Sequence, residues 1–384
     1  MRCLAGAGAC CTQVLKPGLT ALAWERHTIA GNHGSLRNVL PRPRREAASG
    51  GQSSTQCNQD LKVGLALDVG GLGDKSFNDA AYTGLQNAIR DGLVCTQNTK
   101  FLEANATGSN RGENVTNLAE AGYKLIVGVG FAFSPDINEI AKDYPDQNFA
   151  VIDGYATCGT ACGLTNDAAA IPNVADLTFT EQQGSFLVGA AAALEAAKLN
   201  NCTTVGFLGG QTGPLIGKFQ AGYTAGVHKV NPNIKVLVQY IGDDVTAFND
   251  ATKGEALSTG MYNDGACIIY HAAGASGAGL FNAAVKANKL AIGVDSDQYL
   301  TASADQKPLI LTSMIKRVDT AVYNAIKQTG DGSFKGGPEV FDLAHQGLDY
   351  SKSNNQLMTP DIIATLELYR QDIINGTIKV PEKP

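Results

Sequence analysis

Short apolar runs alternate with longer amphipathic stretches from residue 63 onward, and the alternation falls into two series. In the first series the pattern predicts strands at 63–67, 99–103, 124–129 and 148–152 and helices at 78–91, 110–121 and 134–142. Apolar runs of about four to eight residues bounded by turn residues are typical of buried strands. Because strands and helices take turns, this series predicts a parallel sheet with helices on both faces.

The second series follows a polar stretch and begins with a helix rich in Ala and Leu at 181–198. It predicts strands at 203–208, 235–240, 266–270 and 290–294 and helices at 217–229, 249–262 and 277–288. Two further strands at 309–313 and 338–344 flank a helix at 315–328, and a last helix covers 360–375. Two such series, in a chain of 384 residues, predict two similar α/β lobes around a cleft.

The first 58 residues have a different character. They show no sustained periodicity, contain Pro41 and Pro43, and are predicted to be a disordered leader that need not belong to the mature protein. The apolar stretch 19–24 is short for a signal peptide, and most of the arginines follow it. The leader holds seven of the 30 basic residues and two of the 36 acidic ones, so the body is more acidic than the net charge of −6 indicates. An acidic body without a basic stripe argues against nucleic acid as a partner.

Six of the nine cysteines lie from Cys57 onward, five of them in the body, and their positions suggest three pairs. Cys57 and Cys95 precede the first two strands, and Cys202 and Cys267 precede the first and third strands of the second series. In sheets ordered 2-1-3 these positions are neighbours, about 5 Å apart, which is within disulfide reach. Cys158 and Cys162 flank a three-residue loop. The pairs Cys57–Cys95, Cys158–Cys162 and Cys202–Cys267 would indicate an oxidising compartment, whereas six inert buried thiols are the alternative.

The segment 63–79 carries the most informative strand end. Its apolar run ends at Asp68 and enters a Gly-rich turn that holds Asp74, Ser76, Phe77 and Asn78. Parallel sheets present ligands at the carboxyl ends of their strands, and polar groups beside an aromatic ring suit a small neutral molecule with a flat face. The turn is not a P-loop, because an aspartate replaces the required glycine and would repel phosphate. A purely structural turn with Asp74 or Asn78 as helix N-cap is the alternative.

Other predicted strand ends carry the same kinds of residue. Glycines, carboxylates, aromatics and a lysine follow successive strands: Gly130, Phe131, Asp153, Phe248, Gly274, Asp295 and Lys316. A single such turn means little. So many at one edge predict a ligand cleft.

Five motifs together resemble the basic membrane protein family of ABC-transporter substrate-binding lipoproteins. They are DVGGLGDKSFN (68–78), GVGFAFS (128–134), VIDG (151–154), GVDSDQ (293–298) and SMIKRVD (313–319). The resemblance covers about 61–380. It implies a type I periplasmic-binding fold with two Rossmann-like lobes of parallel sheets, three hinge crossovers and no catalysis. The lobes are then expected at 59–178 with 296–330, and at 179–295 with 331–384.

Characterised members of this family include purine-nucleoside receptors, in which two aromatics sandwich the base. By motif, Phe77 matches the first aromatic, while Phe248, with Phe219 as the alternative, is chosen for the second. Asp153 matches a base-recognising carboxylate, and the ribose-binding set corresponds to Gly274, Asp295 and Lys316. Ser76 stands where some members carry a base-contacting asparagine.

The chemistry of these side chains fits such a ligand. Stacking on an aromatic contributes about 1–3 kcal/mol per base, and a carboxylate such as Asp295 accepts hydrogen bonds from vicinal ribose hydroxyls. A structural ion pair between Asp295 and Lys316 at the lobe boundary is the alternative for those two residues.

The resemblance therefore implies an extracytoplasmic, cell-membrane-associated binding protein, a monomer held only by a lipid anchor. It would deliver a purine nucleoside to an ABC permease and its ATPase subunits by hinge closure, with no cofactor and no metal. An enzyme, such as a nucleoside hydrolase or a sugar-phosphate enzyme using Asp68, Asp74 and Asp153, is the alternative. A transcriptional regulator of the same fold would need a helix-turn-helix that residues 1–58 do not provide.

Overall fold

The computed structural model of the protein describes residues 57–384. The predicted leader, 1–58, lies outside the described residues apart from its last two. Those two belong to the first lobe, since Cys57 is disulfide-bonded to Cys95 and the Asn58 amide donates to the Gly92 carbonyl at 3.1 Å. No helix within the described residues has the length and apolar character needed to cross a bilayer.

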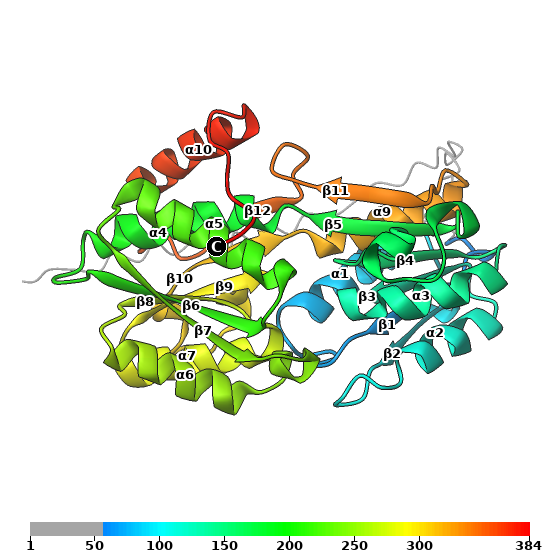
Figure 1. The fold of residues 1–384 in the computed structure, drawn as a ribbon, viewed down its shortest axis with the longest axis horizontal. Coiled ribbons are helices and arrows are strands. Elements are labelled where there is room, and N and C mark those ends of the chain that lie inside the picture. Colours follow the sequence, from blue (N-terminus) through cyan, green and yellow to red (C-terminus); the bar gives the residue numbers. More distant parts are fainter. Residues whose placement is uncertain (1–56) are drawn as a thin grey trace, which may run out of the picture. The chain divides into compact units, whose positions relative to one another are not determined.

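The first lobe is built on a six-stranded parallel sheet with the order β11-β5-β4-β3-β1-β2 (Figure 1). Its strands are β1 (Val63–Leu67), β2 (Thr99–Glu103), β3 (Leu125–Val129), β4 (Asn148–Ile152), β5 (Val174–Phe179) and β11 (Gly337–Phe341). Helices α1 (Phe77–Arg90) and α9 (Val318–Asp331) pack together on one face, and α2 (Arg111–Glu120) and α3 (Ser134–Ile140) cover the other. The central strands β1 and β3 are buried throughout because both faces are covered.

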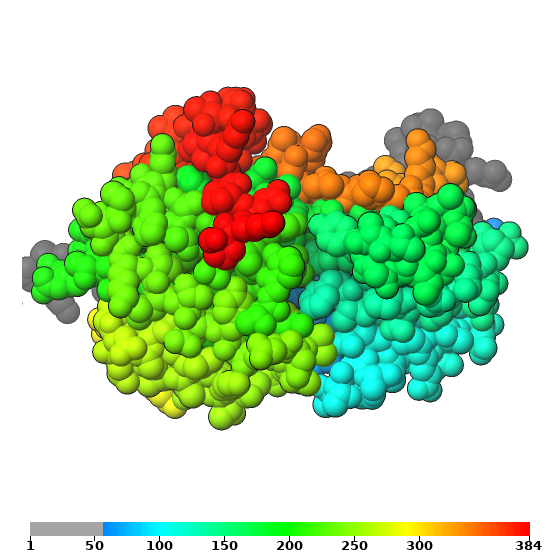
Figure 2. Space-filling view, in the orientation of Figure 1, coloured from blue at the N-terminus to red at the C-terminus, as the bar shows by residue number. Residues whose placement is uncertain are grey.

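The second lobe repeats this plan with the strand order β12-β10-β9-β8-β6-β7. Its strands are β6 (Thr204–Gln211), β7 (Lys235–Gly242), β8 (Ile268–Ala272), β9 (Leu290–Asp295), β10 (Ile310–Lys316) and the antiparallel β12 (Leu348–Tyr350). Helices α4 (Glu181–Ala196), α5 (Pro214–Val230) and α10 (Pro360–Ile374) lie on one side, α6 (Ala251–Asn263) and α7 (Gly277–Ala287) on the other, and the short α8 (Gln298–Thr301) follows β9. The C-terminal segment, red in Figure 2, rests on this lobe, where Gln182 donates to Glu382 at 3.3 Å.

Glycines allow α4 and α5 to pack at short range. A Cβ on Gly222 would lie 2.7 Å from the Cα of Gln182, and one on Gly226 would lie 2.8 Å from the carbonyl carbon of Phe186. Side chains at these two positions would push the helices apart. This close packing buries nearly the whole surface of α4, which explains its uniform Ala-rich sequence.

The chain passes between the two sheets three times, after Phe179, after Lys316 and after Phe341. The first crossing lies where it was expected, but the other two do not. Residues 296–330 were expected in the first lobe, yet β10 pairs with β9 in the second sheet. Residues 331–384 were expected in the second lobe, yet β11 pairs with β5 in the first. The sheet that an isolated strand joins is decided by hydrogen bonds to a neighbouring strand that is distant in the sequence. The residues of the strand itself do not indicate which sheet this is.

The strand order 2-1-3 within each sheet is confirmed by β2-β1-β3 and β7-β6-β8. The three cysteine pairs are also confirmed as disulfides, with Cα–Cα distances of 5.0 Å for Cys57–Cys95, 5.7 Å for Cys158–Cys162 and 5.9 Å for Cys202–Cys267. Bonded cysteines thus join neighbouring strands at their amino ends in both lobes.

Strands β5 and β12 were not predicted. In β5 the run VADLTF is interrupted by Asp176, which is buried because its carboxylate accepts bonds from the amide of Thr157 at 3.1 Å and from its hydroxyl at 2.5 Å. A loop 19 residues away satisfies this charge, so the strand tolerates a residue that local pattern reasoning counts against it. Strand β12 spans only three residues.

Candidate functional site

A cavity lies between the lobes, at the carboxyl ends of both sheets, and holds about 650 Å³ of space not filled by atoms. Eleven of the twelve predicted ligand-binding residues line it: Asp68, Asp74, Phe77, Asn78, Gly130, Phe131, Asp153, Phe248, Gly274, Asp295 and Lys316. Apolar residues complete the lining: Val69, Leu215, Ile216, Phe219, Val245, Ala272, Ala273, Ala275 and Val294. Its apolar wall with a few polar groups is typical of small-molecule sites.

Ser76 is the predicted residue that does not line the cavity. It is fully buried, and its hydroxyl donates to the carboxylate of Asp295 at 2.6 Å. A serine of the first lobe therefore contacts a cavity residue of the second.

Lys316 occupies the charged centre of the cavity wall. Its ammonium pairs with the carboxylate of Asp153 and lies 3.4 Å from Glu181, whose other oxygen lies 3.3 Å from Lys218. The side chains of Lys316, Asp153 and Glu181 are at most 4% exposed. Sequence reasoning missed Glu181, although a glutamate that opens a fully buried Ala-rich helix was a usable signal.

Burial sets the electrostatics of this group. It raises the pKa of Asp153 and of Asp295, although the nearby Lys316 ammonium opposes the shift in both. For Lys316, burial alone would lower the pKa, but the carboxylates of Asp153, Glu181 and Asp295 outweigh burial and raise it. Three carboxyl groups thus face two ammonium groups. The excess of acceptors suits a ligand that donates hydroxyl protons and disfavours an anion.

Aromatic rings surround the same lysine. The Lys316 nitrogen lies 5.1 Å from the ring centroid of Phe77, 5.0 Å from that of Phe179 and 5.4 Å from that of Phe219. Farther along the cavity, Phe131 of the first lobe meets Phe248 of the second edge-on, with centroids 6.5 Å apart. Phe77 and Phe248 keep part of their surface exposed, whereas Phe219 is 3% exposed.

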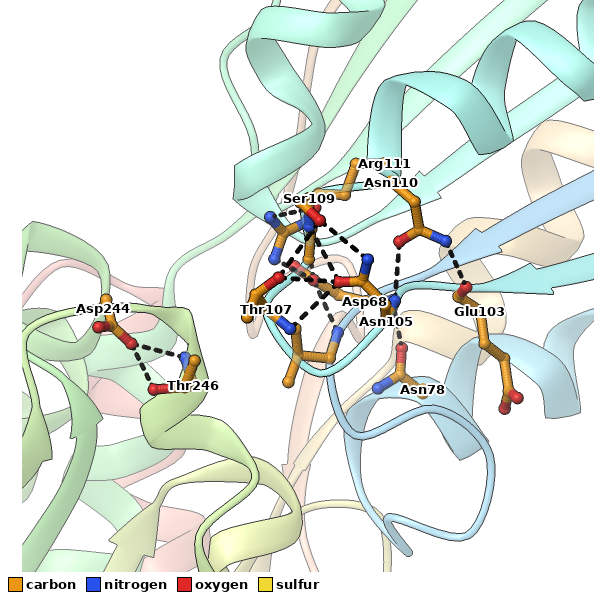
Figure 3. Close-up of polar contacts among 12 residues, drawn as sticks. Asp68, Asn78, Glu103, Asn105, Thr107, Ser109, Asn110, Arg111, Asp244 and Thr246 are labelled. Carbon is orange, nitrogen blue, oxygen red and sulfur yellow. Dashed lines mark hydrogen bonds and ion pairs between the residues drawn. The ribbon is translucent and has the colours of Figure 1, made fainter.

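Asp68 is held by an arginine that sequence reasoning did not select. The Arg111 guanidinium pairs with the Asp68 carboxylate, and the Asn78 side chain accepts a bond from the Asp68 amide at 3.0 Å (Figure 3). Burial raises the pKa of Asp68, and the bond from Arg111 opposes this. Figure 3 also shows the polar loop that precedes Arg111, in which Asn105 and Ser109 bond to each other.

Asp74 both lines the cavity and caps α1. Its carboxylate accepts bonds from the amides of Ser76 at 2.9 Å, Asn78 at 2.8 Å and Asp79 at 3.1 Å. Burial nevertheless raises its pKa to about 6. The structural interpretation of this turn therefore holds for Asp74 without removing it from the cavity wall.

Three residues at this site have left-handed backbone conformations that side chains disfavour: Lys75 with φ 54°, Asp153 with φ 61° and Asp295 with φ 63°. Such conformations persist where the surrounding structure holds them, and they are concentrated at functional sites.

The carboxylates named for the enzyme alternative have separate structural partners: Arg111 for Asp68, helix amides for Asp74 and Lys316 for Asp153. His271 lies buried in β8 with its Nε2 atom 2.9 Å from Gln298, and it does not line the cavity.

Comparison with known proteins agrees with this geometry. The family model described as ABC transporter substrate-binding protein PnrA-like matches residues 61–384. The chain is 36% identical over 343 residues to the CD4+ T-cell-stimulating antigen of Listeria innocua. This alignment covers 85% of this chain and 90% of that protein. It is 33% identical over 364 residues to the ABC transporter nucleoside-binding protein BmpA of Lactococcus lactis, covering 90% and 95% of the two chains.

Solved structures give the same result for the fold. An ABC transporter solute-binding protein from Aeropyrum pernix superposes with a TM-score of 0.70 at 28% identity, covering 84% of this chain and 94% of that one. The expected type I periplasmic-binding fold is therefore confirmed. On the family model and these identities, the chain belongs to the PnrA-like family of substrate-binding proteins of ABC transporters.

Proposed function

We propose that this substrate-binding protein takes up a nucleoside, with a purine base preferred, in the cavity between its lobes and delivers it to an ABC permease. One observation carries the proposal. A single cavity combines partly exposed aromatic faces from both lobes with a buried group of carboxylates around one lysine. A nucleoside has the matching halves, a flat base and a sugar rich in hydroxyl groups.

The base is assigned to the space between Phe77 and Phe248. These rings come from opposite lobes and keep exposed surface, whereas Phe219 is 3% exposed. Stacking on each ring contributes about 1–3 kcal/mol. Asp153 is assigned to the polar edge of the base, and Asp68, Asp74, Asn78, Gly130 and Phe131 shape the wall around it.

The sugar is assigned to Asp295, Lys316 and Gly274. Asp295 projects from the end of β9, and Lys316 from the end of the adjacent β10. Gly274 has φ 54°, and a Cβ there would lie 3.3 Å from the carbonyl oxygen of Phe248, so a glycine keeps this part of the wall open. The relative from Lactococcus lactis, a nucleoside-binding protein, supports this choice of ligand class.

Membership of the family implies a permease and its ATPase as partners and a location outside the cytoplasm. We assign the protein to the extracytoplasmic face of the cell membrane, held there by a lipid anchor, and expect a monomer. The three disulfides support an oxidising location.

Isothermal titration calorimetry with adenosine, guanosine, inosine and cytidine, and with free adenine and ribose, tests the proposal. We expect tighter binding of the purine nucleosides than of either half alone, and a loss of about 1–3 kcal/mol in Phe77→Ala. The exposed ring of Phe101 provides a control variant, Phe101→Ala, with wild-type affinity. Absence of binding to every nucleoside would overturn the proposal, and free base accumulating in a chromatographic assay would favour the hydrolase instead.

A further inference from the structure

Four contacts join the lobes where α1 begins. The Ser76 hydroxyl donates to the Asp295 carboxylate at 2.6 Å and also lies 3.4 Å from the Val294 carbonyl. The Ser296 hydroxyl donates back to the Ser76 carbonyl at 3.1 Å, and the Lys75 ammonium donates to the Thr301 carbonyl at 3.3 Å. Lys75 and Ser76 belong to the first lobe, and their four partners belong to the second. Separation of the lobes would break all four contacts together.

The Ser76 hydroxyl can bond to the second lobe because Asp74, and not the Ser76 side chain, caps helix α1. A serine at the N-cap of a helix ordinarily accepts a bond from a helix amide. Here Ser76 occupies the N-cap of α1 without a side-chain capping bond, since Asp74 accepts from the amides of Asn78 and Asp79. Ser76 is also fully buried and absent from the cavity wall. Its side chain therefore serves the contact between the lobes.

The partner carboxylate needs such support. Asp295 is 6% exposed, lines the cavity and has φ 63°. Within residues 57–384 the hydrogen bond to its side chain comes from the Ser76 hydroxyl. Lys75, which precedes Ser76 in the chain, also has a left-handed backbone, with φ 54°. A strained conformation persists only when its surroundings determine it strongly. The contacts between the lobes surround Asp295 and Lys75 and hold their backbones in these conformations.

We propose that Ser76 is a positioning residue, which orients Asp295 toward the ligand only when the lobes are together. In this view Lys75, Ser76 and Ser296 form an interlobe latch, by which we mean these three residues and their contacts. The latch couples closure to recognition of the sugar hydroxyls. The part that concerns the sugar rests on the proposed function, whereas the part that concerns closure does not.

Calorimetry with two ligands tests the positioning role. In the full-length protein, Ser76→Ala should weaken binding of inosine about 10- to 100-fold, because a hydrogen bond to a charged group is lost. Binding of 2′,3′-dideoxyinosine, which lacks the hydroxyls assigned to Asp295, should weaken no more than it does in Ser296→Ala, and Ser76→Ala should add little to the selective loss for inosine once Asp295→Ala is present. An equal loss for both nucleosides, or no loss, would overturn the positioning role.

Two further variants control this experiment. Ser296→Ala removes a latch contact without touching Asp295, so it should weaken both nucleosides equally. Ser333→Ala breaks a similar serine–aspartate bond, to Asp331 at 2.5 Å, but on an exposed part of the first lobe, and should change neither affinity.

Hydrogen exchange without ligand tests the latch independently of the proposed function. Amides in 72–80 and 293–301 should exchange faster in Ser76→Ala and Ser296→Ala than in wild type, and at the wild-type rate in Ser333→Ala. Unchanged exchange in both latch variants would overturn the latch. If wild type binds no nucleoside but this exchange difference appears, the proposed ligand is wrong and the latch stands.

Discussion

The ammonium of Lys316, at the end of β10 in the second lobe, forms an ion pair with the carboxylate of Asp153, at the end of β4 in the first lobe. Both side chains are at most 4% exposed, so the pair lies out of water at the centre of the proposed site. The same residues that are assigned to the ligand therefore also join the lobes. Their removal should affect stability as well as binding.

Lys316→Met should lower the free energy of unfolding by about 3–5 kcal/mol, because it leaves the carboxylates of Asp153 and Glu181 buried without their shared cation. Urea denaturation measures this. The matched control is Lys286→Met, since Lys286 pairs with Glu255 but is 69% exposed, and should change stability by less than about 1 kcal/mol. Equal effects of the two substitutions would contradict the structural role of Lys316.

Phe248→Ala should weaken nucleoside binding by about 1–3 kcal/mol, while the melting temperature of the free protein changes little, because this ring is partly exposed in the cavity. Phe219→Ala should show the opposite balance, a loss of about 3–5 kcal/mol in stability from an emptied core position that is 3% exposed. Calorimetry and thermal unfolding of both variants separate the two roles. If Phe219→Ala, after correction for folding, lost the larger share of affinity, the second stacking ring would be Phe219.

Gly222→Ala should destabilise the protein by about 1–3 kcal/mol, since the added methyl group meets the backbone of Gln182 on α4. Gly260→Ala on α6 provides the control, because no atom lies within 4 Å of a Cβ at that position. There alanine should stabilise the helix by up to about 1 kcal/mol. Chemical denaturation of the two variants should therefore give changes of opposite sign, and a neutral Gly222→Ala would contradict the close packing of α4 and α5.

Replacing the Cys202–Cys267 pair with serines should cost about 4 kcal/mol, because that disulfide closes a loop with a sequence separation of 65. The Cys158–Cys162 pair has a separation of 4, so its removal should cost less than about 3 kcal/mol. Guanidinium denaturation ranks the two variants, and thiol titration of the denatured, unreduced protein should find none of the six disulfide-bonded cysteines free. A reversed ranking would contradict the loop-entropy argument.

The free energy of unfolding should depend on pH through the protonation of Asp74. Burial raises its pKa from 3.8 to about 6 in the folded state, so the folded protein binds more protons than the unfolded chain between these values. The contribution of Asp74 to the free energy of unfolding must then fall as pH rises from about 4 to about 6. Relative to wild type, Asp74→Asn should gain on the order of 3 kcal/mol across that window.

Denaturation at half-unit steps from pH 4 to pH 8 measures this difference. Asp305→Asn is the control, since the Ser303 hydroxyl lowers the pKa of the exposed Asp305 carboxyl below its ordinary value. Its difference from wild type should stay level between pH 4 and pH 6. A level difference for Asp74→Asn as well would show that Asp74 is not desolvated in the folded protein.

Local pattern reasoning located most of the short strands, and even the partly exposed edge strand β2 was expected at its exact bounds. The central strands β1, β3 and β4 were expected almost residue for residue, because an apolar run between turn glycines has few other interpretations. It missed β5, whose buried Asp176 depends on Thr157 in a distant loop. Strands β10 and β11 were each expected in the wrong lobe for a similar reason. Their pairing with β9 and β5 is decided by contacts between residues that are far apart in the sequence.

The same division applies to the site. Site residues at strand ends could be recognised in the sequence as glycines, carboxylates and aromatics, because a parallel sheet brings such ends to one edge whatever the details of packing. The sequence did not reveal the roles of Arg111, Glu181 and Ser76, because each of these residues acts through a partner on another element or lobe. The sequence by itself determined two wound sheets, three disulfides and most of the cavity wall. Only the tertiary structure decided which charges are paired, which lobe each late strand joins and how the lobes meet, since those depend on distances between residues that the chain order leaves open.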